Sequence, residues 1–407
     1  MICGLLGGCL GHSYSPMIHE YLGDYEYDLF QVEHDRLHDF LENTDFHGLN
    51  VTMPYKKAVI PYLSWISPEA ERIGSVNTIV REDDGLYGYN TDYFGFLYAA
   101  EIAGISFWGK KVLVLGSGGA SLAVQAAVKD SAAREVLVVS RTGELNYSNI
   151  SQHSDADIIV NATPVGMCPD NDGLPVDLGD FPKCSGVIDL VYNPMRTRLV
   201  LEAEKRGIKC TGGLAMLVAQ AKYASDLFLN IHREDDMIGD ILDDVHRELA
   251  DIVLVGMPGC GKSSVGAHLA QRLSRTFVDT DAEVEKLAGC TVPDIIARDG
   301  EACFRKLESQ VISELSRKNS LVIATGGGAV LENCNVDALR QNSMVFFIRR
   351  ELDKLAVQGR PLSMAGSLAD MYDRRRSLYE KAADFTVDND KAVAHTSDDI
   401  LELGGWI

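Results

Sequence analysis

The stretch from Gly256 to Ser263, Gly-Met-Pro-Gly-Cys-Gly-Lys-Ser, constrains the fold of this chain more than any other. It follows the apolar run from Ile252 to Val255 and leads into a segment with helical periodicity, from Ser264 to Ala270. A glycine loop between a strand and a helix is the context in which G-x-x-x-x-G-K-[ST] holds phosphate. The pattern therefore predicts a nucleoside triphosphate site. A glycine-rich turn with a solvated lysine is the weaker interpretation.

Several groups of this loop are expected to act together on a nucleoside triphosphate. Backbone N–H groups surround the phosphates, and the helix N-terminus adds positive potential. Lys262 reaches the outer phosphates, and the Ser263 hydroxyl takes a Mg²⁺ position. The residues predicted to contact the nucleotide here are Gly259, Cys260, Gly261, Lys262, Ser263 and Ser264.

Length and charge limit the remaining possibilities. A chain of 407 residues is too long for one ordinary core, so two or three domains are expected. A formal net charge of −21 argues against nucleic-acid and anionic-membrane partners, and it requires a few placed cations for any anionic substrate. Nine cysteines without C-x-x-C pairs, and the lack of a signal-peptide pattern, predict a cytoplasmic protein. The oligomeric state stays open.

The part of the chain before residue 250 alternates short strands and helices. A unit of such elements extends to about Gly88, and a second begins with the apolar strand Val112 to Leu115. Further strands are expected at 136–140, 157–161, 187–190 and 208–210, with helices between several of them. This alternation predicts a parallel, doubly wound sheet and an α/β fold class.

The strand from Val112 to Leu115 is followed by a glycine loop of the dinucleotide-binding type. Its third position is Ser121 rather than glycine, so the motif alone is a weak signal. An NAD site usually has Asp or Glu after the next strand, whereas this chain has Ser140-Arg141-Thr142. Because a guanidinium can pair with a 2′-phosphate, these residues favour NADP(H). A solvated surface arginine is the alternative.

Candidate reactive groups lie in the N-terminal unit. Ser13 and Ser15 offer two hydroxyls suited to a carboxylate, although Ser15 before Pro16 is also a good helix N-cap. Taken singly, Lys56 reads as a solvated loop lysine and Asp92 as a helix cap. Their combination with the surrounding motifs is what suggests a function.

These motifs occur in a defined order and resemble those of shikimate dehydrogenase. They are Asn50-Val51-Thr52-Met53-Pro54-Tyr55-Lys56, Gly74-Ser75-Val76-Asn77-Thr78, Gly88-Tyr89-Asn90-Thr91-Asp92, the glycine loop, and Asn161-Ala162-Thr163-Pro164-Val165-Gly166-Met167. The resemblance covers the chain from about Gly4 to Leu229. It implies that the helix from Ala215 packs against the N-terminal unit.

The resemblance also implies roles for individual residues. Lys56 and Asp92 form the catalytic pair, and the substrate is surrounded by Ser13, Ser15, Thr52, Asn77 and Gln220 together with that pair. NADP is bound by Gly116, Gly118, Gly119, Ala120, Ser140, Arg141, Thr142, Leu190, Tyr192 and Gly213. An ammonium near the developing alkoxide stabilises its charge and can supply the proton, while the carboxylate fixes its position. The sequence leaves open which of the pair transfers the proton.

The half of the chain after residue 250 resembles shikimate kinase from Asp251 to about Asp388. The motifs are the phosphate loop, Asp279-Thr280-Asp281, Phe304-Arg305 with Glu308, the triple glycine from Gly326, and Gly359-Arg360-Pro361-Leu362. Asp281 alone could also be a favourable acid at a helix N-terminus.

By this resemblance Ser263 and Asp279 serve Mg²⁺, and Arg360 lies on a mobile lid over the phosphates. Shikimate is held by Asp281, Arg305, Gly327 and Arg375. The choice of Arg375 over its neighbours rests on its spacing to Leu378-Tyr379. The pair Arg349-Arg350 has no assigned role, and a solvated surface is its default interpretation.

Together the two resemblances predict a bifunctional enzyme of chorismate and aromatic amino acid biosynthesis, reducing 3-dehydroshikimate with NADPH and phosphorylating shikimate with ATP and Mg²⁺. The expected domains are a substrate-binding domain at 1–97 completed by about 215–232, a Rossmann-type NADP domain at 98–214, an acidic connector at 233–249 and a P-loop kinase domain at 250–407. The alternatives are a non-catalytic shikimate or quinate sensor, and a dehydrogenase half that is active on quinate or prefers NAD.

Overall fold

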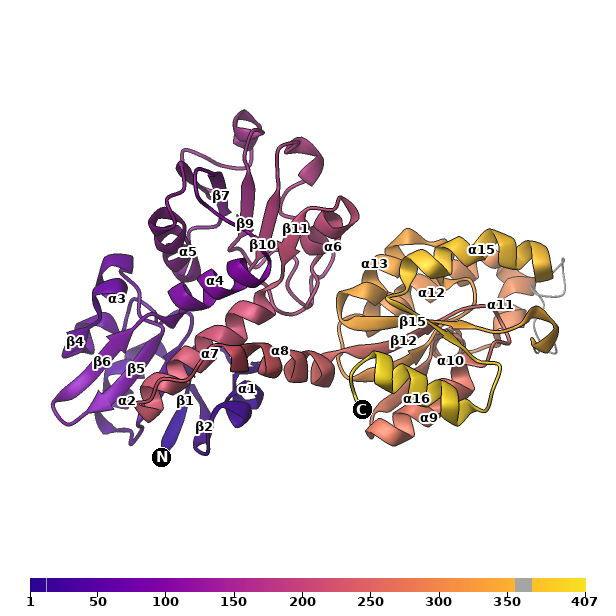
Figure 1. Ribbon diagram of the computed structural model, residues 1–407, viewed down its shortest axis with the longest axis horizontal. Helices are drawn as coiled ribbons and strands as arrows, with labels where there is room; N and C mark the ends of the chain where they lie inside the picture. The colour runs from indigo at the N-terminus through magenta and orange to yellow at the C-terminus, as the bar shows by residue number, and fades with distance from the viewer. Residues whose placement is uncertain (12, 356–367) are drawn as a thin grey trace. The chain divides into compact units, whose positions relative to one another are not determined.

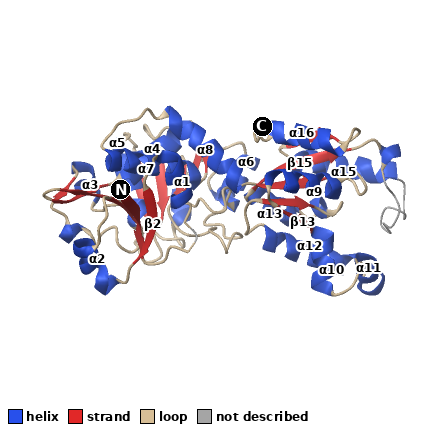
Figure 2. Cartoon of the chain, turned by 90° about the horizontal axis from the view of Figure 1, so that it is seen from below, coloured by secondary structure: helices blue, strands red, loops and turns tan. Residues whose placement is uncertain are grey.

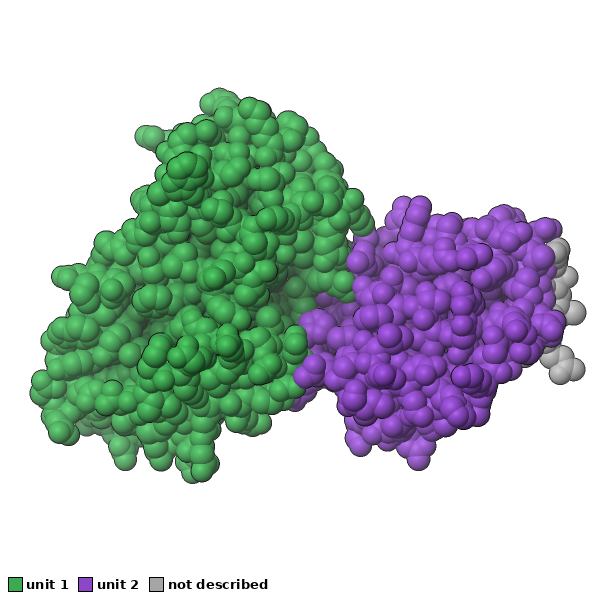
Figure 3. Space-filling model, in the orientation of Figure 1, with its two compact units in different colours: residues 1–245 green, residues 246–407 purple. Residues whose placement is uncertain are grey.

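The computed structural model describes residues 1–11, 13–355 and 368–407, and the chain divides into two units, Met1–Val245 and His246–Ile407. Figure 3 colours the two units separately. The division falls inside one helix, α8 (Asp236–Leu249). Among the helices in the described ranges, none is long and apolar enough to cross a membrane.

The first sheet of the N-terminal unit is mixed, with strand order β2-β1-β3-β5-β6-β4. β1 pairs in parallel with β2 and β3, whereas β3/β5 and β5/β6 are antiparallel. The strands are β1 (Ile2–Gly7), β2 (Glu26–Gln31), β3 (Gly48–Val51), β4 (Trp65–Ile66), β5 (Thr78–Glu82) and β6 (Gly85–Tyr89), and the helices before β7 are α1 (Ser15–Leu22), α2 (Leu37–Asn43), α3 (Pro68–Ile73) and α4 (Thr91–Ile102).

The second sheet is wholly parallel, in the order β11-β10-β9-β7-β8. Alternate residues of β7 enter two different cores: Val112 and Val114 pack with α4 and α5, while Leu113 and Leu115 pack with α6. A strand buried on both faces explains its continuous apolar run. The elements are β7 (Lys111–Leu115), β8 (Glu135–Val139), β9 (Ile158–Asn161), β10 (Gly186–Asp189), β11 (Lys209–Thr211), α5 (Gly119–Asp130) and α6 (Arg198–Lys205).

A long helix, α7 (Gly213–Leu229), returns the chain to the first sheet, where it contacts α1, α4 and β5 (Figure 1). Phe228 near its end packs with Cys3 and Val80, and its carbonyl lies 2.7 Å from His47 Nε2. The helix ends at Leu229, and Asn230 caps it in a left-handed conformation with φ 51°. The first and second sheets are therefore joined by a buried helix as well as by the chain between them.

The C-terminal unit has one parallel sheet, in the order β13-β14-β12-β15-β16, with helices on both faces (Figures 1 and 2). Its strands are β12 (Asp251–Val255), β13 (Thr276–Asp279), β14 (Leu321–Ala324), β15 (Ser343–Arg349) and β16 (Phe385–Asp388). Its helices are α9 (Lys262–Leu273), α10 (Thr280–Ala288), α11 (Val292–Asp299), α12 (Glu301–Leu315), α13 (Asn333–Gln341), α15 (Leu368–Ala382) and α16 (Val393–Leu403). The α/β fold predicted from the alternating elements is confirmed in both units.

Candidate active sites

The N-terminal unit contains a cavity of about 200 Å³ between the first sheet, the second sheet and α7. Its lining comes from β1, β3, the first turns of α4 and α7, and the loop after β10. All seven residues predicted around the substrate line this one cavity: Ser13, Ser15, Thr52, Lys56, Asn77, Asp92 and Gln220. Segments separated by more than 200 residues are thus brought to one site.

The most chemically distinctive contact in this cavity joins Lys56 to Asp92. Lys56 Nζ lies 2.5 Å from Asp92 Oδ2, and the two side chains are 15% and 9% exposed. Asn77 Nδ2 donates to the other carboxylate oxygen at 2.9 Å. An ammonium has three N–H donors, and Asp92 uses one of them. The arrangement holds a cation at a substrate cavity with donors left for a substrate oxygen.

Asn77 also ties Asp92 to the surrounding backbone. Its Oδ1 accepts from the Thr91 N–H at 2.6 Å, and its Nδ2 lies 3.4 Å from Gln220 Oε1. Gln220 Nε2 donates to the Leu217 carbonyl at 2.9 Å. Because Asn77 is 2% and Gln220 8% exposed, their amide groups bond to neighbouring protein groups rather than to water, and these hydrogen bonds hold them in place.

Asn50 lines the same cavity, although no role was assigned to it from the sequence. Its Oδ1 accepts from Tyr27 Oη at 2.8 Å, and its buried Nδ2 has no partner among the described residues. Tyr27 stacks on His19 with ring centroids 3.9 Å apart, and burial lowers the pKa of His19 to about 3. The tyrosine that donates to Asn50 and the histidine that stacks on it are therefore both uncharged at neutral pH. The signal in the sequence was its place at the start of the Asn50-Val51-Thr52 motif.

The glycine loop after β7 is shaped for a phosphate at the start of α5. Gly116 has φ 103°, and a Cβ there would lie 2.8 Å from the Ala162 carbonyl oxygen, so only glycine fits. Ser121, at the position where glycine is more usual, is fully buried and donates from Oγ to the Gly116 carbonyl at 2.7 Å. The serine thus closes the loop by a hydrogen bond.

The predicted cofactor residues fall into two groups. Four of them line the cavity: Ala120, Leu190, Tyr192 and Gly213. The others lie outside its lining, in the loops that follow β7 and β8 and at the first residue of α5: Gly116, Gly118, Gly119, Ser140, Arg141 and Thr142. Tyr192, whose pKa is raised by burial, lies against Tyr14 at a centroid distance of 5.3 Å. The exposed Arg141, with hydroxyl side chains on either side and no acid at the end of β8, fits a 2′-phosphate.

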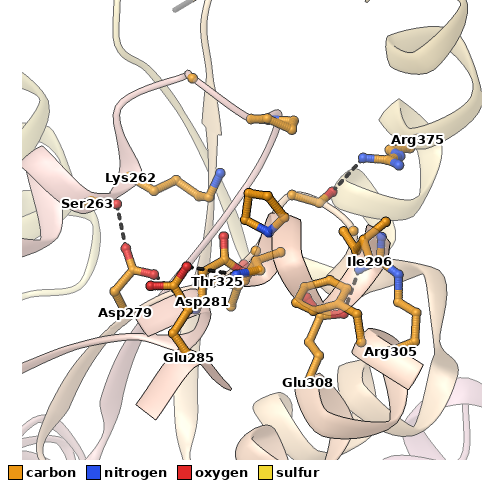
Figure 4. A pocket seen from close by; sticks show the side chains of 18 of the residues that line it. Lys262, Ser263, Asp279, Asp281, Glu285, Ile296, Arg305, Glu308, Thr325 and Arg375 are labelled. Atoms are coloured by element: carbon orange, nitrogen blue, oxygen red, sulfur yellow. Dashed lines mark hydrogen bonds and ion pairs between the residues drawn. The ribbon is translucent and has the colours of Figure 1, made fainter. Parts of the chain in front are cut away.

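The C-terminal unit has its own cavity, of about 260 Å³, shown in Figure 4. It lies at the carboxyl ends of β12, β13 and β14, where ligands of open parallel sheets bind. The predicted residues that line it are Gly259, Lys262, Ser263, Asp279, Asp281, Arg305, Gly327 and Arg375.

The phosphate loop is already held in a curled conformation. Lys262 is 7% exposed, and its Nζ donates to the carbonyls of Gly256 and Met257 at 2.9 and 3.0 Å. The Cys260 side chain is buried, and neither it nor Gly261 nor Ser264 lines the cavity. Arg360 of the predicted lid lies outside the described residues.

Oxygen donors that fit Mg²⁺ lie beside Lys262. Ser263 Oγ donates to Asp279 Oδ2 at 2.7 Å, as Figure 4 shows. A hydroxyl and one or two carboxylates, completed by phosphate oxygens and water, are typical magnesium ligands. The described residues contain no ready group of three His, Cys, Asp or Glu side chains for a metal.

Asp281 and Arg305 face the same cavity from α10 and α12. Burial, and after it the charge of Asp279, raises the pKa of Asp281 above its ordinary value. Arg305 donates to Glu308 at 2.7 Å and to Glu301 at 3.0 Å. Glu308 is fully buried, and burial raises its pKa. Glu308 was quoted within a sequence motif but not assigned a role, and it fixes Arg305 at the cavity wall.

The three consecutive arginines of α15 have different surroundings. Arg375 lines the cavity and donates to the Gly327 carbonyl at 3.1 Å. Arg374 donates to a carbonyl of its own helix, and Arg376 pairs with Glu380 at 2.8 Å, both at exposed positions. Arg375 is therefore the member of the run that presents its charge to the cavity.

Comparison with known proteins gives the family. Residues 5–79 match the model of the shikimate dehydrogenase substrate binding domain. A shikimate dehydrogenase (NADP(+)) from Clostridium beijerinckii is 38% identical over 245 residues, which are 55% of this chain and 90% of that protein. The chain belongs to the shikimate dehydrogenase family. Another relative of the same name, from Clostridium perfringens, is 35% identical over 60% of this chain and 97% of its own length.

Solved structures of this family resemble the dehydrogenase part. A chorismate mutase/shikimate 5-dehydrogenase fusion protein from Clostridium acetobutylicum has a TM-score of 0.58 at 35% identity, covering 60% of this chain and 96% of that one. The shikimate 5-dehydrogenase of Thermus thermophilus, in complex with NADP(H) and shikimate, has a TM-score of 0.55 at 32% identity, covering 60% and 99%. The remaining part also matches a known family, because residues 258–403 fit the shikimate kinase model. The chain thus joins a shikimate dehydrogenase to a shikimate kinase domain, and both predicted resemblances are confirmed.

Proposed function

We propose that this chain catalyses two reactions of the shikimate pathway: the NADPH-dependent reduction of 3-dehydroshikimate to shikimate, and the phosphorylation of shikimate by ATP to shikimate 3-phosphate. The observation that carries the proposal is the partly buried Lys56–Asp92 pair in a cavity lined by all seven predicted substrate residues. We assign the reduction to residues 1–97 and about 215–232 with the NADP domain at 98–214, and the kinase to 250–407 after a connector at 233–249.

In the dehydrogenase half, the proposed chemistry needs a hydride and a proton. NADPH supplies the hydride when bound, with its 2′-phosphate at Arg141. Ser13 and Ser15 hold the substrate carboxylate, and Lys56 places its ammonium at the ring ketone, where it stabilises the alkoxide and provides a proton. Asp92 keeps the ammonium in that position.

In the kinase half, the proposed catalysis is positioning and charge neutralisation. Arg305 and Arg375 hold the substrate carboxylate, and Asp281 holds its ring hydroxyls. Lys262 meets the outer phosphates of ATP with its ammonium, which has three N–H donors and gives two of them to the carbonyls of the loop. Ser263 and Asp279 hold Mg²⁺ with the phosphates.

The main rival is a sensor that binds pathway metabolites without turnover. Such a protein has no need of Lys56, Asp92, Lys262 and Asp279 together, and all four are present at cavity walls. A second rival is a dehydrogenase half that also oxidises quinate. Steady-state rates on shikimate and on quinate, each with NADP⁺ and with NAD⁺, test these proposals. Turnover of shikimate with NADP⁺ supports our assignment, and binding of shikimate without turnover by either half favours the sensor.

Cofactor preference is expected to depend on Arg141. Losing a charge-assisted contact to the 2′-phosphate costs about 1.5–3 kcal/mol, or roughly ten- to a hundredfold in affinity. Arg141→Ala should therefore raise the Michaelis constant for NADP⁺ by about this factor and leave that for NAD⁺ unchanged. Arg134→Ala is the matched control, because Arg134 is an exposed arginine of the same domain. Equal weakening of both cofactors by Arg141→Ala contradicts the assignment.

A further inference from the structure

Arg349 and Arg350, the adjacent pair to which the sequence assigned no role, make different contacts in the structure. Arg349 ends β15 and forms a bidentate pair with Asp388 of β16, at 2.5 and 2.8 Å. Arg350 is the first residue after the strand, and its side chain reaches Gly261 at the start of α9 instead. Arg350 lies at the carboxyl end of β15, next to β12, the strand that leads into the phosphate loop.

Arg350 lies directly beside that loop. A Cβ at Gly261 would lie 3.8 Å from Arg350 Nη1 and 2.3 Å from Asn389 Nδ2. Asn389 is 3% exposed; it donates to the Cys260 carbonyl at 2.7 Å and accepts from Thr396 Oγ1 at 2.8 Å. Its backbone N–H donates to the Arg349 carbonyl at 2.8 Å. Asn389 therefore fixes the end of β15, and with it Arg350, against the residues that begin α9.

The charge of Arg350 is not balanced by a nearby acid in the described part of the chain. Asp388 is occupied by Arg349, and Asp390 accepts from the Glu351 N–H and lies 3.6 Å from Lys354 Nζ. Arg350 Nε is buried without a hydrogen-bond partner among the described residues. Residues 356–367 contain no Asp or Glu, so they offer it no carboxylate either. A partly buried cation of this kind needs an anion to offset its desolvation.

We propose that Arg350 binds the polyphosphate chain of the nucleotide, as a second fixed cation beside Lys262. The inference rests on the proposed ATP site and adds a residue to it. Gly261 is the N-cap of α9, and helix N-termini hold phosphate through their free N–H groups. A guanidinium next to these N–H groups adds a planar, charged fork that matches phosphate oxygens. In a chain of net charge −21, each cation held at the site matters for anion binding.

The test is calorimetric titration of the full chain with ATP, inorganic triphosphate and adenosine. Arg350→Gln should raise the dissociation constants of ATP and triphosphate by roughly ten- to a hundredfold, since a charge-assisted contact is lost. The dissociation constant of adenosine should not change, which also shows that the unit is folded. Arg350→Lys should restore part of the ATP affinity. The matched control is Arg349→Gln, which removes the exposed ion pair with Asp388 and should leave all three constants unchanged.

Two results overturn the proposal: equal ATP affinity of wild type and Arg350→Gln, or an equal loss for adenosine, which places Arg350 at the base or sugar. Failure of the kinase assignment itself gives a different result. If the wild-type chain binds ATP but does not phosphorylate shikimate, the proposed function is wrong, while the Arg350 comparison still decides its own question.

Discussion

Lys56→Ala is expected to abolish reduction of 3-dehydroshikimate while ATP-dependent phosphorylation of shikimate continues at the wild-type rate. The substitution removes the ammonium that lies 2.5 Å from Asp92 in the cavity, and a positioned proton donor contributes about a hundred- to ten-thousandfold. Kinase turnover should persist because Lys56 and the phosphate loop belong to different compact units. Initial rates of NADPH oxidation and of ADP formation on one sample measure both effects.

Lys57→Ala is the matched control, because Lys57 is the exposed neighbour in the same loop. It should leave both rates unchanged. The Lys56 substitution also leaves the Asn77 hydrogen bond to Asp92 in place, so the carboxylate keeps one partner. A Lys56→Ala protein that still reduces the substrate at near wild-type rate shows that the proton comes from another group. Equal loss of both activities shows a general folding defect instead.

Lys262→Ala should have the opposite effect, with loss of phosphorylation and retained reduction. The ammonium is the cation that our proposal places at the transferring phosphoryl group, and the loss of one such preorganised charge costs roughly a hundred- to a thousandfold in rate. The ammonium also donates to two loop carbonyls, so the unfolding of the C-terminal unit must be measured for the same variant.

Lys286→Ala provides the control for this variant. Lys286 is 78% exposed on α10 and lies 3.5 Å from Glu283 in a surface ion pair, so its removal should not change the rate. A Lys262→Ala chain with an unchanged melting transition and unchanged phosphorylation is incompatible with the proposed ATP site.

Much of the fold could be predicted because its signals are local. The buried runs at β7 and β12 are apolar at almost every position, which is what a parallel sheet covered on both faces requires. Glycine loops after both strands predicted the helices that follow. The mixed pairing of the first sheet was not predicted, since β3 and β5 meet through antiparallel contacts that strand composition does not encode.

Residues of the candidate sites could be predicted where they belong to a recognisable motif. They could not be predicted where their role depends on the position of another side chain in the fold. Arg375 could be chosen by spacing, and it faces the cavity. Asn50 and Glu308 stood within quoted motifs, but their burial and their contacts with Tyr27 and Arg305 follow only from packing.

The arginine pair is the clearest case. Arg349 and Arg350 are indistinguishable in the sequence. Only the pairing of β15 with β16 shows that Asp388 forms its ion pair with Arg349. Such a difference depends on strand register, which a run of two like charges does not specify.

We propose that one chain carries out both steps, and this can be tested by supplying it with 3-dehydroshikimate, NADPH, ATP and Mg²⁺ alone. We predict that shikimate 3-phosphate accumulates as the final product, in amounts equal to the NADPH oxidised and the ADP formed, and that omission of Mg²⁺ stops the sequence at shikimate. If NADPH is oxidised in the complete mixture but shikimate accumulates without any phosphorylated product, the chain does not carry out both steps.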